Sequence, residues 1–290
     1  MKILLTGKNG QVGWELQRSL CTLGDVVALG SAELDLADAD AIVSTVRAIK
    51  PDLIVNPAAY TAVDKAEAEP DLALAVNGRA PGILAEEARR LGALLVHYST
   101  DYVFDGSNDL PWRETDAPAP LNVYGNSKLQ GEQALAAVGG RHLILRTSWV
   151  YGARGRNFFL TMRKLLQERQ ELKVVADQIG APTSSRLLAE LTAQLLVRAR
   201  HGDLPPLLHA VAAGSTSWFG FAEAIARDLR GRGRRVAELH PIPSSGYPVP
   251  ARRPLNSRLD ISLLESVSGN AMPDWRQVLA LVLEEAGDGC

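Results

Sequence analysis

Short runs of apolar residues alternate along the chain with stretches in which apolar residues recur every three or four positions. Five runs are typical of strands: Ile3–Leu5, Val26–Leu29, Leu53–Val55, Leu94–Val96 and Leu143–Leu145. The stretches between them have helical spacing, over residues 12–23, 42–49, 70–91 and 124–138. Because the strands are continuous apolar runs, we predict a parallel sheet buried on both faces. Right-handed crossovers between successive strands then give a doubly wound α/β fold.

The rhythm of strand and helix loosens in the second half of the chain. Prolines gather there at Pro205–Pro206 and again over residues 241–254. We therefore predict a dinucleotide-binding domain over residues 1–172 and a smaller lobe, mainly for substrate, over residues 173–290. The apolar run Leu207–Val211 is typical of a strand, and we expect it to return to the sheet of the first domain.

Composition and charge exclude several classes of protein. The 290 residues are 46% hydrophobic and 22% charged, with a net charge of −2, so we expect no nucleic-acid or membrane partner. No apolar run reaches the roughly 20 residues of a membrane span. Two cysteines are too few for a stapled secreted fold; we expect Cys21 in the core and Cys290 in an unstructured tail. These features favour a cytoplasmic protein, either a monomer or a homodimer.

A glycine-rich loop, Thr6-Gly-Lys-Asn-Gly-Gln-Val-Gly13, joins the first strand to the first helix. Gly7 permits the tight turn, Gly10 lets backbone amides approach a pyrophosphate, and Gly13 lets the helix pack on the strand. Gln11 and Val12 begin the helix, where free N–H groups and the helix dipole favour anions. The order of strand, loop and helix predicts a Rossmann-type dinucleotide site.

The loop after the second strand bears on the choice of cofactor. A dinucleotide site usually has an acid there to hold the adenosine 2′-hydroxyl, but Gly30 and Ser31 occupy this place. Lys8, inside the glycine loop, is able to approach a 2′-phosphate. We therefore expect NADPH to be accepted at least as well as NADH. Asp35 and Leu36 follow closely and are predicted to meet the adenine.

Tyr124 and Lys128 form the predicted catalytic pair. Four residues apart on a helix, they lie on one face, about 6 Å apart at Cβ. We expect the ammonium and a nicotinamide cation to lower the pKa of Tyr124 from about 10 toward the working pH. Tyr124 would then protonate a ketone oxygen as hydride reaches its carbon, while Lys128 would also hold the nicotinamide ribose.

Small and hydroxylated residues follow the third and fourth strands, where the ligand crevice of such a sheet opens. Ser99-Thr100 ends the fourth strand, and Thr100 is predicted to hydrogen-bond the substrate carbonyl beside Tyr124. The stretch from Asn56 to Thr61 ends the third strand with small residues suited to a flat cofactor. His97, inside the fourth strand, is interpreted as a core histidine.

The chain resembles the extended short-chain dehydrogenase/reductase superfamily and, within it, the dTDP-4-dehydrorhamnose reductases. The resemblance rests on GKNGQVGWELQRSL, VNPAAYTAVDKAEAEP, HYSTDYVFDG, PLNVYGNSK, RTSWVYG, DQIGAPT and RPLNSRLD. It implies reduction of the 4-keto group of dTDP-4-dehydrorhamnose to dTDP-L-rhamnose with NADPH or NADH. It also implies cofactor contacts at Gly10, Gln11, Val12, Asp35, Leu36, Ala59, Tyr60 and Thr61, and substrate contacts at Thr100, Asp101 and Trp149, with Tyr124 as proton donor.

Two positions depart from the family pattern, and the first bears on the choice of cofactor. Relatives can carry an acid at Gly30, and some carry histidine at Tyr60.

Sugar-nucleotide dehydratases resemble this chain but show Thr-Asp-Glu where it has Thr-Asp-Tyr102, so elimination is disfavoured. The remaining alternatives are an epimerase and a regulatory subunit similar to that of methionine adenosyltransferase.

The forked side chains of Arg252 and Arg253 suit pyrophosphate oxygens. Glu15 is compatible with a Mg²⁺ bridge between subunits, but the sequence predicts no metal.

Overall fold

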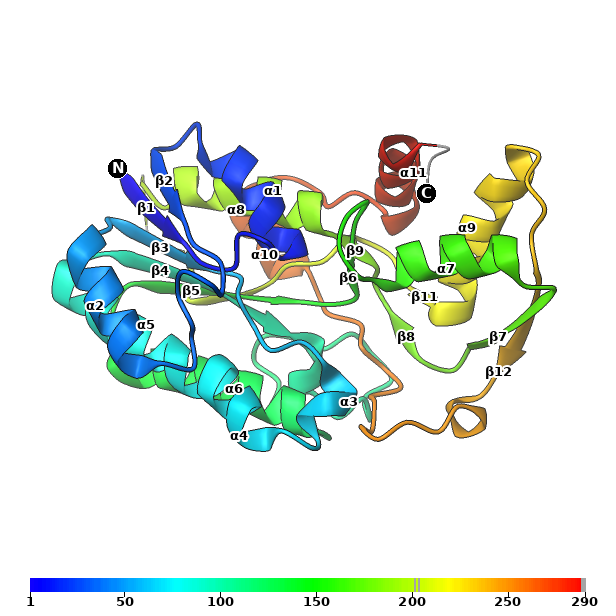
Figure 1. The fold of residues 1–290 in the computed structure, drawn as a ribbon, viewed down its shortest axis with the longest axis horizontal. Coiled ribbons are helices and arrows are strands. Elements are labelled where there is room, and N and C mark those ends of the chain that lie inside the picture. The colour runs from blue at the N-terminus through cyan, green and yellow to red at the C-terminus, as the bar shows by residue number, and fades with distance from the viewer. Residues whose placement is uncertain (201, 203, 288–290) are drawn as a thin grey trace.

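A parallel sheet forms the centre of the larger lobe (Figure 1). The computed structural model describes residues 1–200, 202 and 204–287, and in this part the sheet has six strands. The strands are β1 (Lys2–Leu5), β2 (Asp25–Ala28), β3 (Leu53–Asn56), β4 (Leu94–Thr100), β5 (His142–Thr147) and β10 (Leu207–His209). Their spatial order is β2-β1-β3-β4-β5-β10. The order reverses between β1 and β3, so the carboxyl ends of these strands border a ligand crevice. The predicted doubly wound α/β fold is confirmed.

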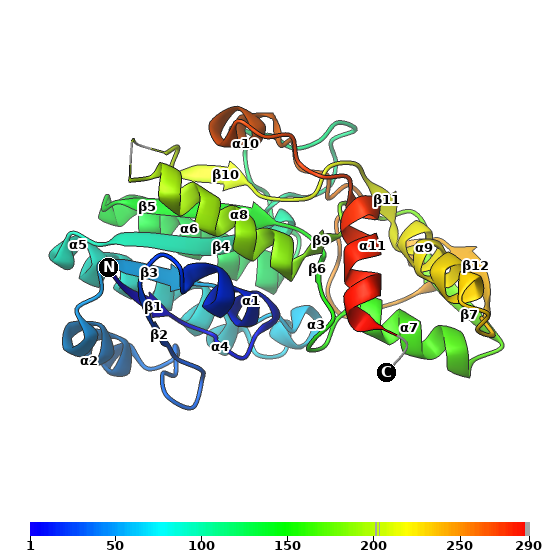
Figure 2. The same ribbon diagram turned by 90° about the horizontal axis from the view of Figure 1, so that it is seen from above.

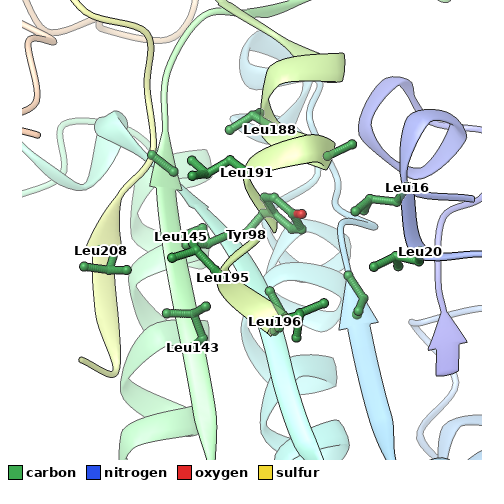
Figure 3. Packing of buried hydrophobic residues seen from close by; sticks show 14 of the residues in the cluster. Leu16, Leu20, Tyr98, Leu143, Leu145, Leu188, Leu191, Leu195, Leu196 and Leu208 are labelled. Carbon is green, nitrogen blue, oxygen red and sulfur yellow. The ribbon is translucent and has the colours of Figure 1, made fainter. Parts of the chain in front are cut away.

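Helices cover both faces of the sheet, as Figures 1 and 2 show. One face carries α1 (Gln11–Leu20), α8 (Ser185–Arg198) and α10 (Ser262–Ser268); the other carries α2 (Ala39–Ile49), α5 (Ala80–Leu91) and α6 (Val123–Val138). Leucines of α1 and α8, among them Leu16 and Leu191, pack on the buried strands (Figure 3). This burial on both faces explains why the strands are continuously apolar.

A smaller lobe surrounds a second apolar core (Figure 2). It consists of α7 (Phe158–Glu168), β7 (Glu171–Val175), α9 (Trp218–Gly231), β12 (Glu238–Ile242) and α11 (Trp275–Ala286). Two short strand pairs lie between the lobes: β6 (Val150–Tyr151) with β9 (Thr183–Ser184), and β8 (Ile179–Gly180) with β11 (Thr216–Ser217).

The chain crosses between the two cores more than once. Helix α7 precedes residue 172 but packs in the smaller lobe, whereas α8 follows that residue and packs on the sheet. Strand β10 pairs in parallel with β5. Packing therefore does not follow a single cut at residue 172, and a division into folding units of 1–172 and 173–290 stays a prediction.

Local structure departs from the sequence pattern at several points. The predicted helix 70–91 comprises α4 (Pro70–Leu74), a π-helical turn (Ala75–Arg79) and α5, with α3 (Val63–Ala66) before them. Pro81 lacks the N–H that would bond the Asn77 carbonyl, which favours a wider turn there. Short 3₁₀ turns span Asp101–Val103 and Ser244–Gly246.

Two predictions about cysteines and membranes have different outcomes. Cys21 is exposed, contrary to the prediction of a core residue, because α1 ends at Leu20 and Cys21 caps it. Cys290 lies outside the described residues. In the part of the chain that the structure describes, no helix combines the length and apolar character needed to cross a membrane.

Candidate active site

A cleft of about 870 Å³ opens at the carboxyl ends of the strands, beside the smaller lobe. It brings together segments that are far apart in sequence, from the glycine loop to α9. Most of the predicted site residues line it: Gly7, Gly10, Gln11, Val12, Gly13, Asp35, Leu36, Ala59, Thr61, Thr100, Asp101, Tyr124, Lys128 and Trp149.

The glycine loop has the geometry of a phosphate cradle. Gly7 has a φ of +60°, and a Cβ atom on Gly13 would lie 2.0 Å from the Gly7 carbonyl oxygen, so a side chain at Gly13 would push the helix off the loop. Helix α1 starts at Gln11 with no side-chain cap on its first amides. Uncapped amides at a helix start attract anions, and the loop therefore fits a dinucleotide pyrophosphate.

An acid does reach the end of β2, although none stands there in sequence. The Glu33 carboxylate accepts a hydrogen bond from the Gly30 amide at 2.8 Å and forms an ion pair with Lys8. Lys8 lowers the pKa of Glu33 through this contact. From the sequence we expected no acid near the adenosine 2′ position and a Lys8 side chain available to a 2′-phosphate. The ion pair between Lys8 and Glu33 corrects both expectations. Its signal in the sequence is weak, since Glu33 lies three residues past the usual position.

The segment after β3 is held in place by a buried asparagine that the sequence pattern did not reveal. Asn77, in the π-helical turn, bonds both the amide and the carbonyl of Tyr60, at 2.8 and 2.9 Å, and also bonds Ser127 of α6. The Tyr60 hydroxyl donates to Glu69 at 2.7 Å. Tyr60 is not among the cleft-lining residues, so any contribution to the cofactor would come from its backbone.

Thr100 joins the acidic and phenolic groups of the cleft. Its hydroxyl donates to the buried Asp101 carboxylate at 2.9 Å and opposes the rise in the pKa of Tyr124. Burial raises the pKa of Asp101 to about 6. Tyr102, where dehydratases have glutamate, packs edge-on against the Tyr124 ring at 5.9 Å between centroids.

The two members of the predicted catalytic pair both line the cleft, but the expected lowering of the tyrosine pKa is not seen. Removal from water raises the pKa of Tyr124 to about 12, with the Asp101 charge adding to the rise. Lys128 is buried, and its ammonium donates to the Tyr98 carbonyl. Burial lowers the pKa of Lys128 to about 7. In the protein alone, desolvation thus sets the direction of the shift in the tyrosine pKa, contrary to the lowering that we expected from Lys128.

Two indoles form one wall of the cleft. Trp149 and Trp218 stack with centroids 3.6 Å apart and planes 8° apart, and the Trp218 indole donates to Gln178 at 3.1 Å. Trp149 has a φ of +47°, a strained value for such a residue. A Cβ atom on Gly180 would lie 2.6 Å from this indole. Trp218 was not predicted from the sequence, because it begins α9 far along the chain from the other site residues.

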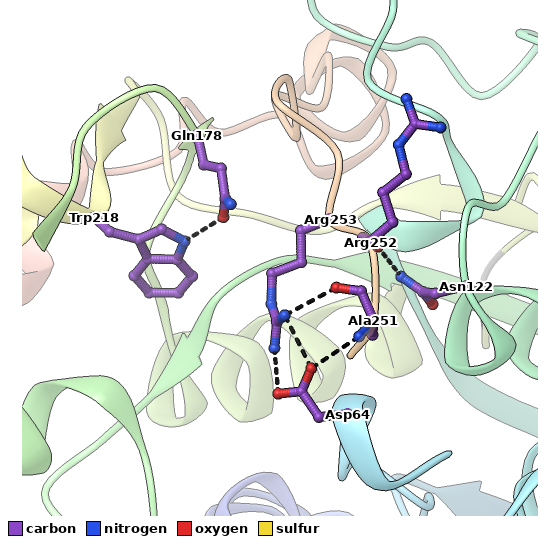
Figure 4. Close-up of polar contacts among 7 residues, drawn as sticks. All are labelled: Asp64, Asn122, Gln178, Trp218, Ala251, Arg252 and Arg253. Carbon is purple, nitrogen blue, oxygen red and sulfur yellow. Dashed lines mark hydrogen bonds and ion pairs between the residues drawn. The ribbon is translucent and has the colours of Figure 1, made fainter. Parts of the chain in front are cut away.

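The segment 251–253 docks the smaller lobe onto the cleft (Figure 4). Arg253 forms an ion pair with Asp64 at 2.8 Å, and the Arg252 carbonyl accepts from Asn122 at 2.8 Å. Asn122 also caps α6 by accepting from the Gly125 amide. The Arg253 fork is therefore engaged with a carboxylate, and it lowers the pKa of Asp64.

Carboxylates are not gathered for a metal in the part of the chain described. Glu15 pairs with Arg186 at 3.4 Å, and among residues 1–200, 202 and 204–287 no group of three His, Cys, Asp or Glu side chains is placed to hold an ion.

The arrangement matches known proteins over nearly the whole chain. The family model described as RmlD substrate binding domain matches residues 1–287. The dTDP-4-dehydrorhamnose reductase of Burkholderia thailandensis is 50% identical, with 98% of this chain and 99% of that protein covered. The chain belongs to the dTDP-4-dehydrorhamnose reductase family. The Escherichia coli enzyme of that name is 47% identical, over 98% of both chains.

Solved structures agree with this membership. A dTDP-4-dehydrorhamnose reductase from Clostridium acetobutylicum has a TM-score of 0.91 at 37% identity, over 98% of this chain and 99% of that chain. Another from Bacillus anthracis, in complex with NADP, has a TM-score of 0.89 at 35% identity, over 98% and 99%. A UDP-glucose 4-epimerase from Thermus thermophilus, at 20% identity and a TM-score of 0.83 with both chains fully covered, shares the fold alone. The predicted family and enzyme class are confirmed.

Proposed function

We propose that this reductase converts the 4-keto group of dTDP-4-dehydrorhamnose to the hydroxyl of dTDP-L-rhamnose, with Tyr124 as proton donor. The observation that carries the proposal is that Thr100, Tyr124 and Lys128 line the same cleft as the glycine loop. Relatives at 47–50% identity bear the name of this activity, and one solved relative holds NADP.

The cofactor would lie along the carboxyl edge of the sheet. The amides of Gln11 and Val12, at the uncapped start of α1, suit its pyrophosphate. Asp35 and Leu36 suit its adenine, and Ala59 and Thr61 would pack against it. A reduced nicotinamide supplies the hydride when bound. Both NADPH and NADH remain candidate donors.

Each polar residue beside Tyr124 has a separate task. The Thr100 hydroxyl, which donates to Asp101 in the structure, would donate to the substrate oxygen instead. Because the pKa of Tyr124 is raised to about 12, its phenol is fully protonated at neutral pH and ready to donate. A charged Lys128 stabilises the tyrosinate left behind. Trp149 offers a flat apolar face to the sugar or base.

Tyr102 favours reduction over elimination. Dehydration needs an acid to expel water, and a phenol whose pKa is raised far above neutrality by burial is a poor replacement for a carboxyl group. The edge-on contact with Tyr124 instead fixes the ring of the proton donor. Turnover without net consumption of NADPH would favour an epimerase.

The proposal is tested by NADPH oxidation with the dTDP-4-keto sugar, followed by absorbance. Replacing Tyr124 with Phe keeps the ring and removes the proton, and we expect a loss of about 10²- to 10⁴-fold in kcat. Unchanged turnover in this variant would overturn the role of Tyr124. Arg47→Met, at an ion pair far from the cleft, is the control. A cytoplasmic location and a monomeric or homodimeric state are part of the proposal, and sedimentation analysis tests the latter.

A further inference from the structure

A chain of buried polar side chains runs beneath the cleft from the glycine loop to the catalytic lysine. The Thr6 hydroxyl donates to Asn56 Oδ1 at 2.6 Å, and Asn56 Nδ2 lies 3.1 Å from His97 Nδ1. His97 Nε2 in turn lies 3.1 Å from Lys128 Nζ. All four residues are buried, His97 completely, so water does not supply alternative partners. Each hydrogen-bonding choice along the chain therefore constrains the next.

Strand register creates this chain. Leu5 is paired with Val55, and Asn56 with His97, so Thr6, directly after β1, lies beside Asn56 of β3 and His97 of β4. Residues two positions earlier on these strands pack against α2, α5 and α6. Since side chains alternate between faces, the polar trio points toward the same helices, and Lys128 of α6 meets it there.

The donors and acceptors of the chain permit two consistent states. An ammonium has three donors and no acceptor, so a charged Lys128 needs His97 Nε2 as acceptor. The imidazole proton is then on Nδ1 and needs Asn56 Oδ1 as its acceptor. In the other state, the imidazole proton is on Nε2 and a neutral Lys128 amine accepts it, while Asn56 turns Nδ2 toward His97, which is the amide orientation in the structure. A half-turn of the Asn56 amide exchanges the two states.

We propose that His97 is a positioning residue whose tautomer, selected by the Asn56 amide, sets the charge and orientation of Lys128. The two states differ by one proton, which Lys128 loses to solvent, while the imidazole carries one proton in both. This rests on the proposed function, because the charge of Lys128 matters there for stabilising the tyrosinate of Tyr124.

Surrounding charges leave Lys128 balanced between its two forms. Burial lowers its pKa to about 7, and Glu132 opposes this. Burial and the lysine charge hold the pKa of His97 well below its usual value, so the imidazole acts as a neutral relay. The charged group that acts on Lys128 is Glu132, four residues further along α6, which is itself paired with Arg146 of β5. Tyr124 lies four residues before Lys128 on the same helix.

The tautomer of His97 can be read directly by ¹⁵N NMR on the histidine-labelled protein without substrate. The chain has five histidines, and the signal lost in His97→Gln identifies the right one. Between about pH 5.5 and about pH 9 we expect the proton to move from Nδ1 to Nε2, with a midpoint near the Lys128 pKa. Lys128→Met should abolish the movement. Asn56→Asp, which offers only acceptors, should raise the midpoint by about one pH unit or more.

Kinetics give a second measurement. His97→Leu removes the acceptor for Lys128, and we expect kcat to fall about ten- to hundredfold, with the KM for the sugar nucleotide unchanged. His97→Gln, whose amide oxygen can accept, should recover most of the loss. Thr192→Val removes a buried hydrogen bond with Tyr98 on the opposite face of the sheet and is the control for general destabilisation.

The outcomes separate this proposal from the proposed function. A wild-type His97 that keeps one tautomer throughout, or a midpoint that Asn56→Asp leaves in place, would overturn the switch. A loss of activity in His97→Leu that appears only as a higher KM for the sugar nucleotide, with kcat unchanged, would also overturn the switch. Because the NMR measurement uses no sugar, a wild-type protein that fails to reduce the dTDP-4-keto sugar overturns the proposed function alone.

Discussion

The buried ion pair between Glu132 and Arg146 offers a quantitative test of how α6 is held on the sheet. Two hydrogen bonds join the side chains, at 2.9 and 2.6 Å, and their exposed fractions are 3% for Arg146 and 7% for Glu132. Replacing Glu132 alone by Met leaves the guanidinium buried without a counter-charge. Breaking such a pair from one side costs about 3–5 kcal/mol.

This cost converts to a shift in the unfolding temperature. An entropy of unfolding of about 2.1 cal/mol/K per residue gives roughly 0.6 kcal/mol/K for a chain of this length. Glu132→Met should therefore lower the midpoint by about 5–8 °C. Replacing Arg146 by Leu as well removes the stranded charge beside the Phe104 ring, 5.0 Å away, and the double variant should recover most of the stability.

Thermal and urea unfolding of the four proteins, followed by circular dichroism, complete a double-mutant cycle. We expect a coupling free energy of at least about 2 kcal/mol. A loss below about 1 kcal/mol in Glu132→Met, or a double variant as unstable as the two single losses added together, would refute the reasoning.

Three further predictions concern the cleft. Lys8→Ala should leave the Glu33 charge uncompensated and favour NADH over NADPH about fivefold, and Glu33→Gln should do the reverse, as measured by kcat/KM for each cofactor. The pKa of Asp101 is about 6, which lies above its value in the unfolded chain. The neutral carboxyl therefore stabilises the fold fully below about pH 4, and this contribution to the free energy of unfolding is lost as pH rises through about 6. Asp101→Asn should not show this loss of about 3 kcal/mol when urea unfolding is compared at the two pH values. Trp218→Ala removes the indole stacked on Trp149, and the KM for the sugar nucleotide should rise about two- to tenfold with that for NADPH unchanged.

Much of the fold follows from local pattern, because it depends on signals a few residues long. Apolar runs mark the strands, and Gly7 to Gly13 marks the turn into α1. The strand pairs β6–β9 and β8–β11 have two residues in each strand. Strands of this length are too short to produce a recognisable pattern of apolar and polar residues. The π-helical turn before α5 follows from Pro81, but a pattern of apolar residues does not distinguish it from a straight helix.

The site was predictable where topology alone gathers residues and not where side chains arrive from elsewhere. Thr100 and Ala59 follow neighbouring strands of one parallel sheet, so their meeting is a consequence of strand order. Trp218 reaches the cleft from the smaller lobe, and no local signal in the sequence ties it there. Arg253, which the sequence suggested for a pyrophosphate, instead pairs with Asp64. Burial of His97 was predicted correctly from its place in a strand. Its contact with Lys128 was not, because alternation fixes which face a residue occupies, while strand register and helix packing decide what it touches there.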